Sequence, residues 1–89
     1  MFLSIHSLNK TLFEGPIQKL TAKTAVGELT ILDKHIPLLV PLMPGLLRIV
    51  LKPNGLAQGD NNEEATFQIG NGFLEVKPKG EVVVLANSA

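Results

Sequence analysis

The segment 27–39 reads GELTILDKHIPLL. Within it, residues 29–31 (LTI) alternate apolar and polar side chains. This alternation predicts a β-strand with one face in a core and the other in solvent. The glycine-containing stretch 25–28 comes directly before it and supplies a turn. The segment therefore indicates a short strand that begins at a tight turn.

Similar turn signals recur along the whole chain, about every eight to ten residues, which is the rhythm of an all-β sandwich or barrel. They lie at Gly15-Pro16, 25–28, 43–46, 52–55, 58–62, 70–72 and 77–80. No window of helical length shows a period of about 3.6 residues free of Pro and Gly. The sequence predicts an all-β fold, a flattened antiparallel sandwich of about 8–10 strands. We expect one domain over residues 1–89, with 53–62 as a loop inside it.

The segments between the turns differ in their patterns. Residues 74–76 (LEV) alternate like 29–31, whereas 81–85 (EVVVL) is β-branched and apolar on both sides. The second pattern predicts a central strand covered on both faces. Ile17, Leu20 and Ala22 fall out of strict alternation, and a β-bulge between 17 and 20 would restore the register.

Composition excludes several classes of function. Aromatic residues make up 4% of the chain, and eight Lys and Arg balance eight Asp and Glu. A nucleic-acid partner is not expected, because such sites use basic patches and stacking aromatics. The absence of cysteine excludes disulfides and thiolate metal sites. The amino terminus lacks a signal-peptide pattern, and prolines interrupt the apolar region 36–51, so we expect a soluble, cytoplasmic protein.

Catalytic and cofactor-binding patterns are not found in the sequence. The stretch 70–75 (GNGFLE) has two glycines of a dinucleotide fingerprint, but it precedes a strand and is interpreted as a turn. His6 and His35 lie far apart without a metal-ligand spacing. We therefore expect no catalytic residue, no cofactor and no metal site. The four phenylalanines, at positions 2, 13, 67 and 73, are interpreted as core or interface anchors.

Several stretches together resemble one family, the epsilon subunit of the rotary F-type ATP synthase. Segment 27–39 is similar to its Gly-Glu-Leu strand followed by His-Ala-Pro-Leu-Leu, and 43–50 (MPGLLRIV) to its Lys-Pro-Gly strand. Segments 70–76 and 82–86 are similar to its Gly-Gly-x-Leu-Glu-Val and closing strand, and 12–15 to its early Phe-x-Gly. The resemblance runs in order along nearly the whole chain.

The chain also departs from this pattern. Asp33-Lys34 stands where many members carry Pro-Gly or Lys-Asn, and the segment 52–66 is longer than the usual hairpin loop. Members usually continue into an α-helical hairpin that can restrain ATP hydrolysis and in some cases binds ATP. This sequence ends at Ala89. We therefore expect neither inhibition of hydrolysis nor ATP binding from this polypeptide.

The resemblance implies a non-catalytic central-stalk subunit that links gamma to the proteolipid ring and couples proton flow to ATP synthesis. It would lie at the cytoplasmic face of the membrane as a peripheral part of the complex. By the same resemblance, the expected ring contacts are Glu28, Lys34, His35 and Ile36. The expected gamma contacts are Ser7, Leu39, Pro41 and Gly45. The alternative is a free-standing β-sandwich module that binds a ligand or peptide through the loop 53–62.

Overall fold

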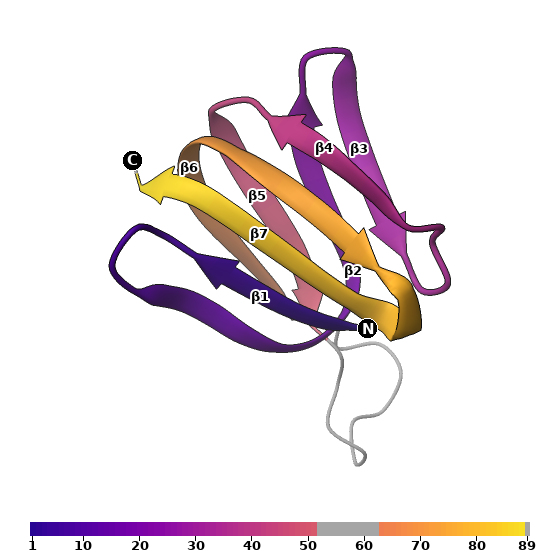
Figure 1. Ribbon diagram of the computed structural model, residues 1–89. Helices are drawn as coiled ribbons and strands as arrows, with labels where there is room; N and C mark the ends of the chain where they lie inside the picture. Colours follow the sequence, from indigo (N-terminus) through magenta and orange to yellow (C-terminus); the bar gives the residue numbers. More distant parts are fainter. Residues whose placement is uncertain (52–62, 89) are drawn as a thin grey trace.

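The computed structural model describes residues 1–51 and 63–88, and these residues form seven β-strands (Figure 1). The strands are β1 (Phe2–His6), β2 (Thr11–Thr24), β3 (Gly27–Leu32), β4 (Leu38–Leu42), β5 (Gly45–Leu51), β6 (Glu64–Lys77) and β7 (Glu81–Ser88). One short 3-10 turn, η1 (Pro78–Gly80), joins β6 to β7. The predicted all-β class is confirmed. The recognition loop of the alternative function, 53–62, lies outside the described residues, and 64–66 already belong to β6.

Two long strands, β2 and β6, each contribute to both layers of the sandwich. The first part of β2 pairs with β1 and its second part with β3 and β5. Likewise, β6 pairs first with β5 and then with β4 and β7, and Figure 1 shows it bending from the rear layer to the front. The expected breaks at Gly15-Pro16 and 70–72 are therefore the points where continuous strands change partners. If β2 and β6 are each counted once in each layer, the seven strands give nine strand segments, within the predicted 8–10.

One strand pair departs from the predicted antiparallel arrangement. β1 and β7 run parallel, with Phe2 opposite Glu81 and His6 opposite Leu85. The pairings β1–β2, β2–β5, β5–β6, β6–β7 and β7–β1 form a closed circuit of five strands. Because alternating directions cannot close a circuit with an odd number of members, one pair has to be parallel. The other pairings are antiparallel.

Alternate residues of facing strands fill the space between the layers. The fully buried side chains are Leu3, Ile5, Ile17, Leu20, Ile31, Leu47, Ile49, Leu74, Val82 and Val84. The predicted bulge is confirmed, because the register of β2 against β5 shifts between Ile17 and Lys19. The prediction that 81–85 is covered on both faces is wrong. Val82 and Val84 are buried, but Leu85 is 56% exposed, since no further layer covers the outer face of β7.

Two lysines have left-handed backbone conformations. Lys34, just after β3, has a φ of 66°, and Lys79 in η1 has a φ of 70°. Gly adopts this region without steric cost and Asn tolerates it, whereas a lysine carries a Cβ that is crowded there.

Gly72 lies at the bend of β6, where the register against β7 shifts between Ile69 and Gly72. An ideal Cβ on Gly72 would lie 2.3 Å from the Leu85 carbonyl oxygen and 2.8 Å from the Ala86 Cα. Both neighbours are backbone atoms of β7. The close approach of β6 to β7 at this bend therefore requires glycine.

Candidate partner-binding surfaces

The outer face of the layer that holds β4, β6 and β7 carries a row of apolar side chains. Pro41 is opposite Phe73 and Phe73 is opposite Leu85, so the three form a ladder across the strands. Phe73 is 55% exposed, and Leu39, two residues before Pro41 in β4, is 68% exposed and lies opposite the exposed Glu75. We call Leu39, Pro41, Phe73 and Leu85 the apolar face. Aromatic and aliphatic side chains exposed together are typical of protein–protein contacts.

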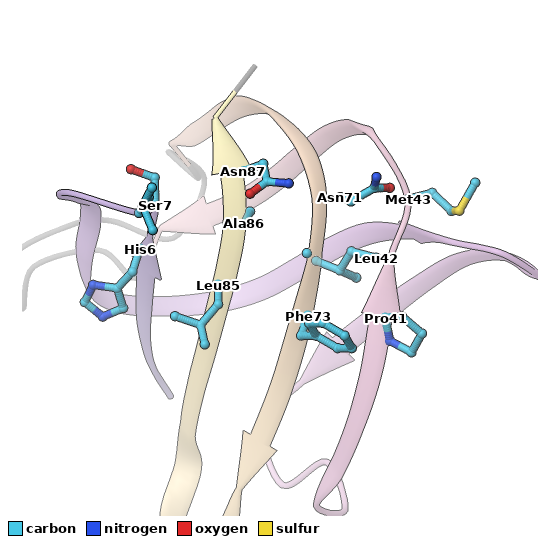
Figure 2. A pocket seen from close by; sticks show the side chains of 12 residues that line it. His6, Ser7, Pro41, Leu42, Met43, Asn71, Phe73, Leu85, Ala86 and Asn87 are labelled. Atoms are coloured by element: carbon cyan, nitrogen blue, oxygen red, sulfur yellow. The ribbon is translucent and has the colours of Figure 1, made fainter.

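A groove of about 640 Å³ continues the apolar face toward one end of the sandwich (Figure 2). Pro41, Phe73 and Leu85 line it, and Figure 2 shows Ser7 and Met43 on opposite sides of these residues. The complete lining is His6, Ser7, Leu8, Pro41, Leu42, Met43, Asn71, Gly72, Phe73, Leu85, Ala86 and Asn87. It brings together four strands and the loop after β1.

The opposite outer face of the sandwich is mostly polar. Its outward side chains include Lys19, Lys23, Glu28, Thr30, Arg48, Glu64, Thr66 and Gln68. Leu32 and Leu46, each 54% exposed, lie separately among them. An Arg48 guanidinium nitrogen lies 3.0 Å from a Glu28 carboxylate oxygen, and both side chains are about half exposed or more. The two outer faces thus differ in character, and the apolar one is suited to a protein partner.

The structure brings three of the four predicted gamma contacts to this region. Leu39 and Pro41 belong to the apolar face, and Ser7 lines its groove. Gly45 does not join them: it begins β5, where an added Cβ would lie 3.3 Å from the Lys23 side chain. Leu85 is not among the predicted contacts, because the apolar pattern of 81–85 predicts a strand covered on both faces.

The predicted ring contacts divide into two places. Lys34, His35 and Ile36 are consecutive in the loop between β3 and β4, and Ile36 is largely exposed. The His35 amide donates to the Leu32 carbonyl over 3.2 Å, and the ring nitrogen Nδ1 lies 2.7 Å from the Ile36 carbonyl oxygen. Glu28 lies at the other end of β3, roughly 20 Å away along the strand.

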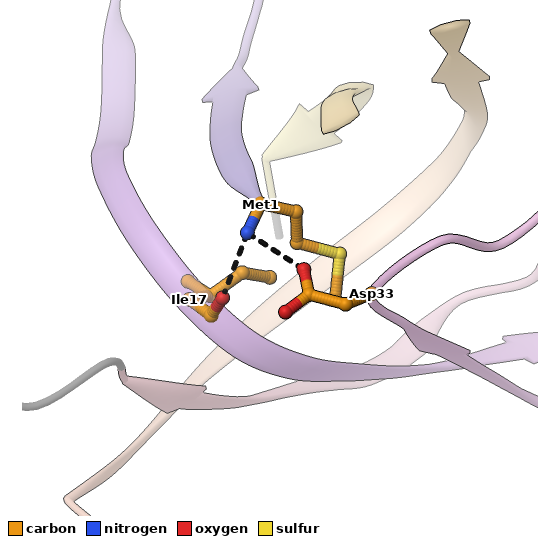
Figure 3. A network of polar contacts seen from close by, with 3 residues as sticks. All are labelled: Met1, Ile17 and Asp33. Carbon is orange, nitrogen blue, oxygen red and sulfur yellow. Dashed lines mark hydrogen bonds and ion pairs between the residues drawn. The ribbon is translucent and has the colours of Figure 1, made fainter. Parts of the chain in front are cut away.

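An ion pair fixes the base of this loop (Figure 3). The ammonium group of Met1 lies 2.9 Å from Asp33 Oδ1 and also donates to the Ile17 carbonyl over 3.3 Å. The Ile17 amide in turn donates to the Met1 carbonyl over 2.8 Å. The Met1 side chain is almost completely buried, whereas the Asp33 side chain is 63% exposed. The pair ties the start of β1 and the middle of β2 to the loop that carries Lys34.

We expect Asp33→Ala to loosen this loop while leaving the sandwich folded. Because the carboxylate is largely exposed, the loss of stability should stay at about 1 kcal/mol or less. The expected signal is faster hydrogen exchange of the His35 amide, which bonds within the same turn. Val84 in the core provides the internal control. Equal exchange at His35 in parent and variant would contradict a fixing role for the ion pair.

The described residues offer little for other chemistry. No group of three or more His, Cys, Asp or Glu side chains among residues 1–51 and 63–88 could hold a metal ion. In the same part of the chain, no helix has the length and apolar character needed to cross a membrane.

Sequence comparison identifies the family. The model of the β-sandwich domain of the ATP synthase delta/epsilon chain matches residues 1–89. The ATP synthase epsilon chain of Dichelobacter nodosus is 36% identical over 85 residues, which cover 96% of this chain and 53% of that protein. The chain belongs to the ATP synthase delta/epsilon chain family and corresponds to its β-sandwich domain. It spans about half the length of the curated relative.

Solved structures share the fold. A chain in the cryo-EM structure of Euglena gracilis mitochondrial ATP synthase (OSCP/F1/c-ring) matches with a TM-score of 0.80 and 21% identity, covering 94% of this chain and 48% of that one. A chain in the Tetrahymena thermophila structure (central stalk/c-ring) matches with a TM-score of 0.75 and 23% identity, covering 99% and 63%. At this identity the likeness concerns the fold.

Proposed function

We propose that the chain links the gamma subunit to the proteolipid ring in the central stalk and helps couple proton flow to ATP synthesis. The observation that carries the proposal is the contrast between the two outer faces of the sandwich. One face exposes Phe73, Leu85 and Leu39, while the other is mostly polar. A subunit held on one side by a protein partner and open to water on the other needs this asymmetry.

Gamma occupies the apolar face and its groove in this proposal, with Ser7, Leu39 and Pro41 among its contacts. The ring contacts the loop with Lys34, His35 and Ile36, and a second point near Glu28. Because a ring of identical subunits repeats the same loop, it can meet two separate points of one partner. The chain would then lie at the cytoplasmic face of the membrane as a peripheral part of the complex. It would bind no ATP.

The direct test is assembly with purified gamma subunit and proteolipid ring. We expect the chain to co-purify with gamma, and the gamma complex to bind detergent-solubilised ring. ATP titrated into the chain in a calorimeter is expected to give no saturable heat. If the chain binds neither gamma nor ring, the proposal is wrong. Saturable ATP binding would contradict the non-nucleotide role.

The variants Glu28→Lys and His35→Ala should weaken assembly with the ring while the fold survives. Both residues lie at exposed turns or strand ends, where substitutions usually change stability by less than about 0.5 kcal/mol. Loss of the Glu28–Arg48 pair adds little, because exposed ion pairs contribute about 0–1 kcal/mol. The measurements are ring binding and proton-driven ATP synthesis by the reconstituted complex. If both variants bind the ring and synthesise ATP like the parent, Glu28 and His35 are not ring contacts.

A further inference from the structure

A second groove, of about 790 Å³, lies between the loop 33–37 and the turn η1. Its lining includes three lysines that are far apart in sequence, Lys34, Lys77 and Lys79. Exposed apolar side chains, Phe2 and Ile36, line it as well. We call it the basic groove. The scattered distribution of these lysines in the sequence gave no sign that they meet.

Positive charge predominates in the basic groove. Two carboxylates line it, those of Asp33 and Glu81. Asp33 forms an ion pair with the Met1 ammonium group, and Glu81 is the cross-strand partner of Lys77. Within residues 1–51 and 63–88, the ion pairs are Met1–Asp33 and Arg48–Glu28, so none of the three groove lysines forms one there. The groove therefore attracts an anionic group from outside the chain.

The backbone singles out the same place. Lys34 and Lys79 are the two residues other than glycine with positive φ in the described part of the chain, and both line this groove. Glycine would fit each position without steric cost. Instead, Lys34 and Lys79 adopt this left-handed conformation, which is unfavourable for a residue that carries a Cβ. Such a local conflict is found where a side chain serves a purpose other than stability.

We propose that the basic groove binds a carboxylate-bearing loop of a protein partner, with the ammonium groups of Lys34, Lys77 and Lys79 facing acidic side chains. The proposal rests on the proposed function, because Lys34 belongs to the loop assigned to the ring, and it identifies an acidic ring loop as the occupant. Exposed Ile36 and Phe2 favour a protein segment, which presents apolar and acidic groups together. Lys77 and Lys79 thereby become ring contacts.

A zero-length carbodiimide reaction tests the pairing directly, because it joins an amine only to a carboxylate in contact with it. In the assembled complex of full chain, gamma and ring, we expect mass spectrometry to find amide links from Lys34, Lys77 or Lys79 to an Asp or Glu of the ring. Lys10, which lies away from both the groove and Glu28, should give none to the ring.

Substitution gives a second readout with its own control. Lys34→Gly combined with Lys79→Gly should raise Tm, by about 2–4 °C for each change, because glycine relieves the left-handed backbone. The same variant should bind the ring roughly tenfold more weakly at low salt, with a flatter salt dependence. The control variant Lys10→Ser removes a positive charge away from both the groove and Glu28, and it should bind the ring like the parent.

The outcomes separate this inference from the function on which it rests. If the parent chain assembles, yet the groove lysines give no links and the double glycine variant binds equally well, the inference is wrong and the proposed function stands. If the parent chain does not assemble, both are wrong. If the parent chain instead binds vesicles rich in phosphatidylserine and the variant does not, without links to the ring, the groove belongs to the membrane surface and the inference is overturned.

Discussion

Replacing Gly72 by Ala is expected to lower the free energy of unfolding by about 3 kcal/mol or more. The new methyl group would lie 2.3 Å from the Leu85 carbonyl oxygen and 2.8 Å from the Ala86 Cα. These atoms cannot retreat easily, because β7 is bonded to β6 on one side and to β1 on the other. A chain of this length has a total stability of roughly 4–13 kcal/mol. Urea denaturation followed by circular dichroism measures the loss.

The matched control for this experiment is Gly70→Ala in the same bend. Its Cβ would lie 3.3 Å from the Asn87 carbonyl oxygen, which a small shift can relieve. Neither glycine has a positive φ, so both variants test space rather than backbone conformation. We expect a loss of about 1 kcal/mol or less for Gly70→Ala. Equal losses at the two positions would show that β6 and β7 do not approach as closely as described.

The second large effect concerns assembly rather than folding. Leu85→Asp should weaken binding to gamma by about 100-fold, because a charge would be desolvated at the centre of an apolar contact. Leu46→Asp is the matched control, since Leu46 is 54% exposed, Leu85 is 56% exposed, and both lie on strands. Both variants should lose similar stability, about 1 kcal/mol, from the poor strand propensity of Asp. Binding is measured by calorimetry with purified gamma.

The matched pair makes the result specific to the apolar face. If Leu46→Asp weakens gamma binding as much as Leu85→Asp, the partner lies on the polar face or the effect reflects lost stability. If neither variant changes the affinity, gamma does not bind the apolar face, and that part of the proposed function is wrong.

Local chemistry predicted much of the fold. Turn residues and alternation in stretches such as 29–31 and 74–76 specify strands, and the misfit between Ile17 and Leu20 specified the bulge. What the sequence did not reveal was continuity. Gly15-Pro16 and 70–72 contain residues typical of turns, yet β2 and β6 continue through them. Strand pairing with distant partners overrides the local preference of these residues for a turn. The parallel pair β1–β7 arises from the closure of the sheet, which no single segment encodes.

The surfaces were harder to predict than the core. The alternation of Leu74 and Val76, which point inward, already places Phe73 on the outside, so one of the three residues of the ladder could be predicted from the sequence. The exposure of Leu85 could not be predicted, because a strand with a continuous apolar run has the same sequence pattern whether one of its faces is covered or both are. The basic groove lay beyond sequence reasoning altogether, since Lys34 and Lys79 meet only through the packing of a loop and a turn 45 positions apart.

The parallel pairing of β1 with β7 sets the order in which the molecule can be completed. Residues 2–6 bond with 81–85, across nearly the whole length of the chain. Until β7 is available, the side of β1 away from β2 has exposed backbone donors and acceptors, and Leu3 and Ile5 lack one wall of their core. On a ribosome, the circuit of strands therefore closes only after the final strand has emerged. Such long-range closure is slow in folding, typically in the range of milliseconds to seconds.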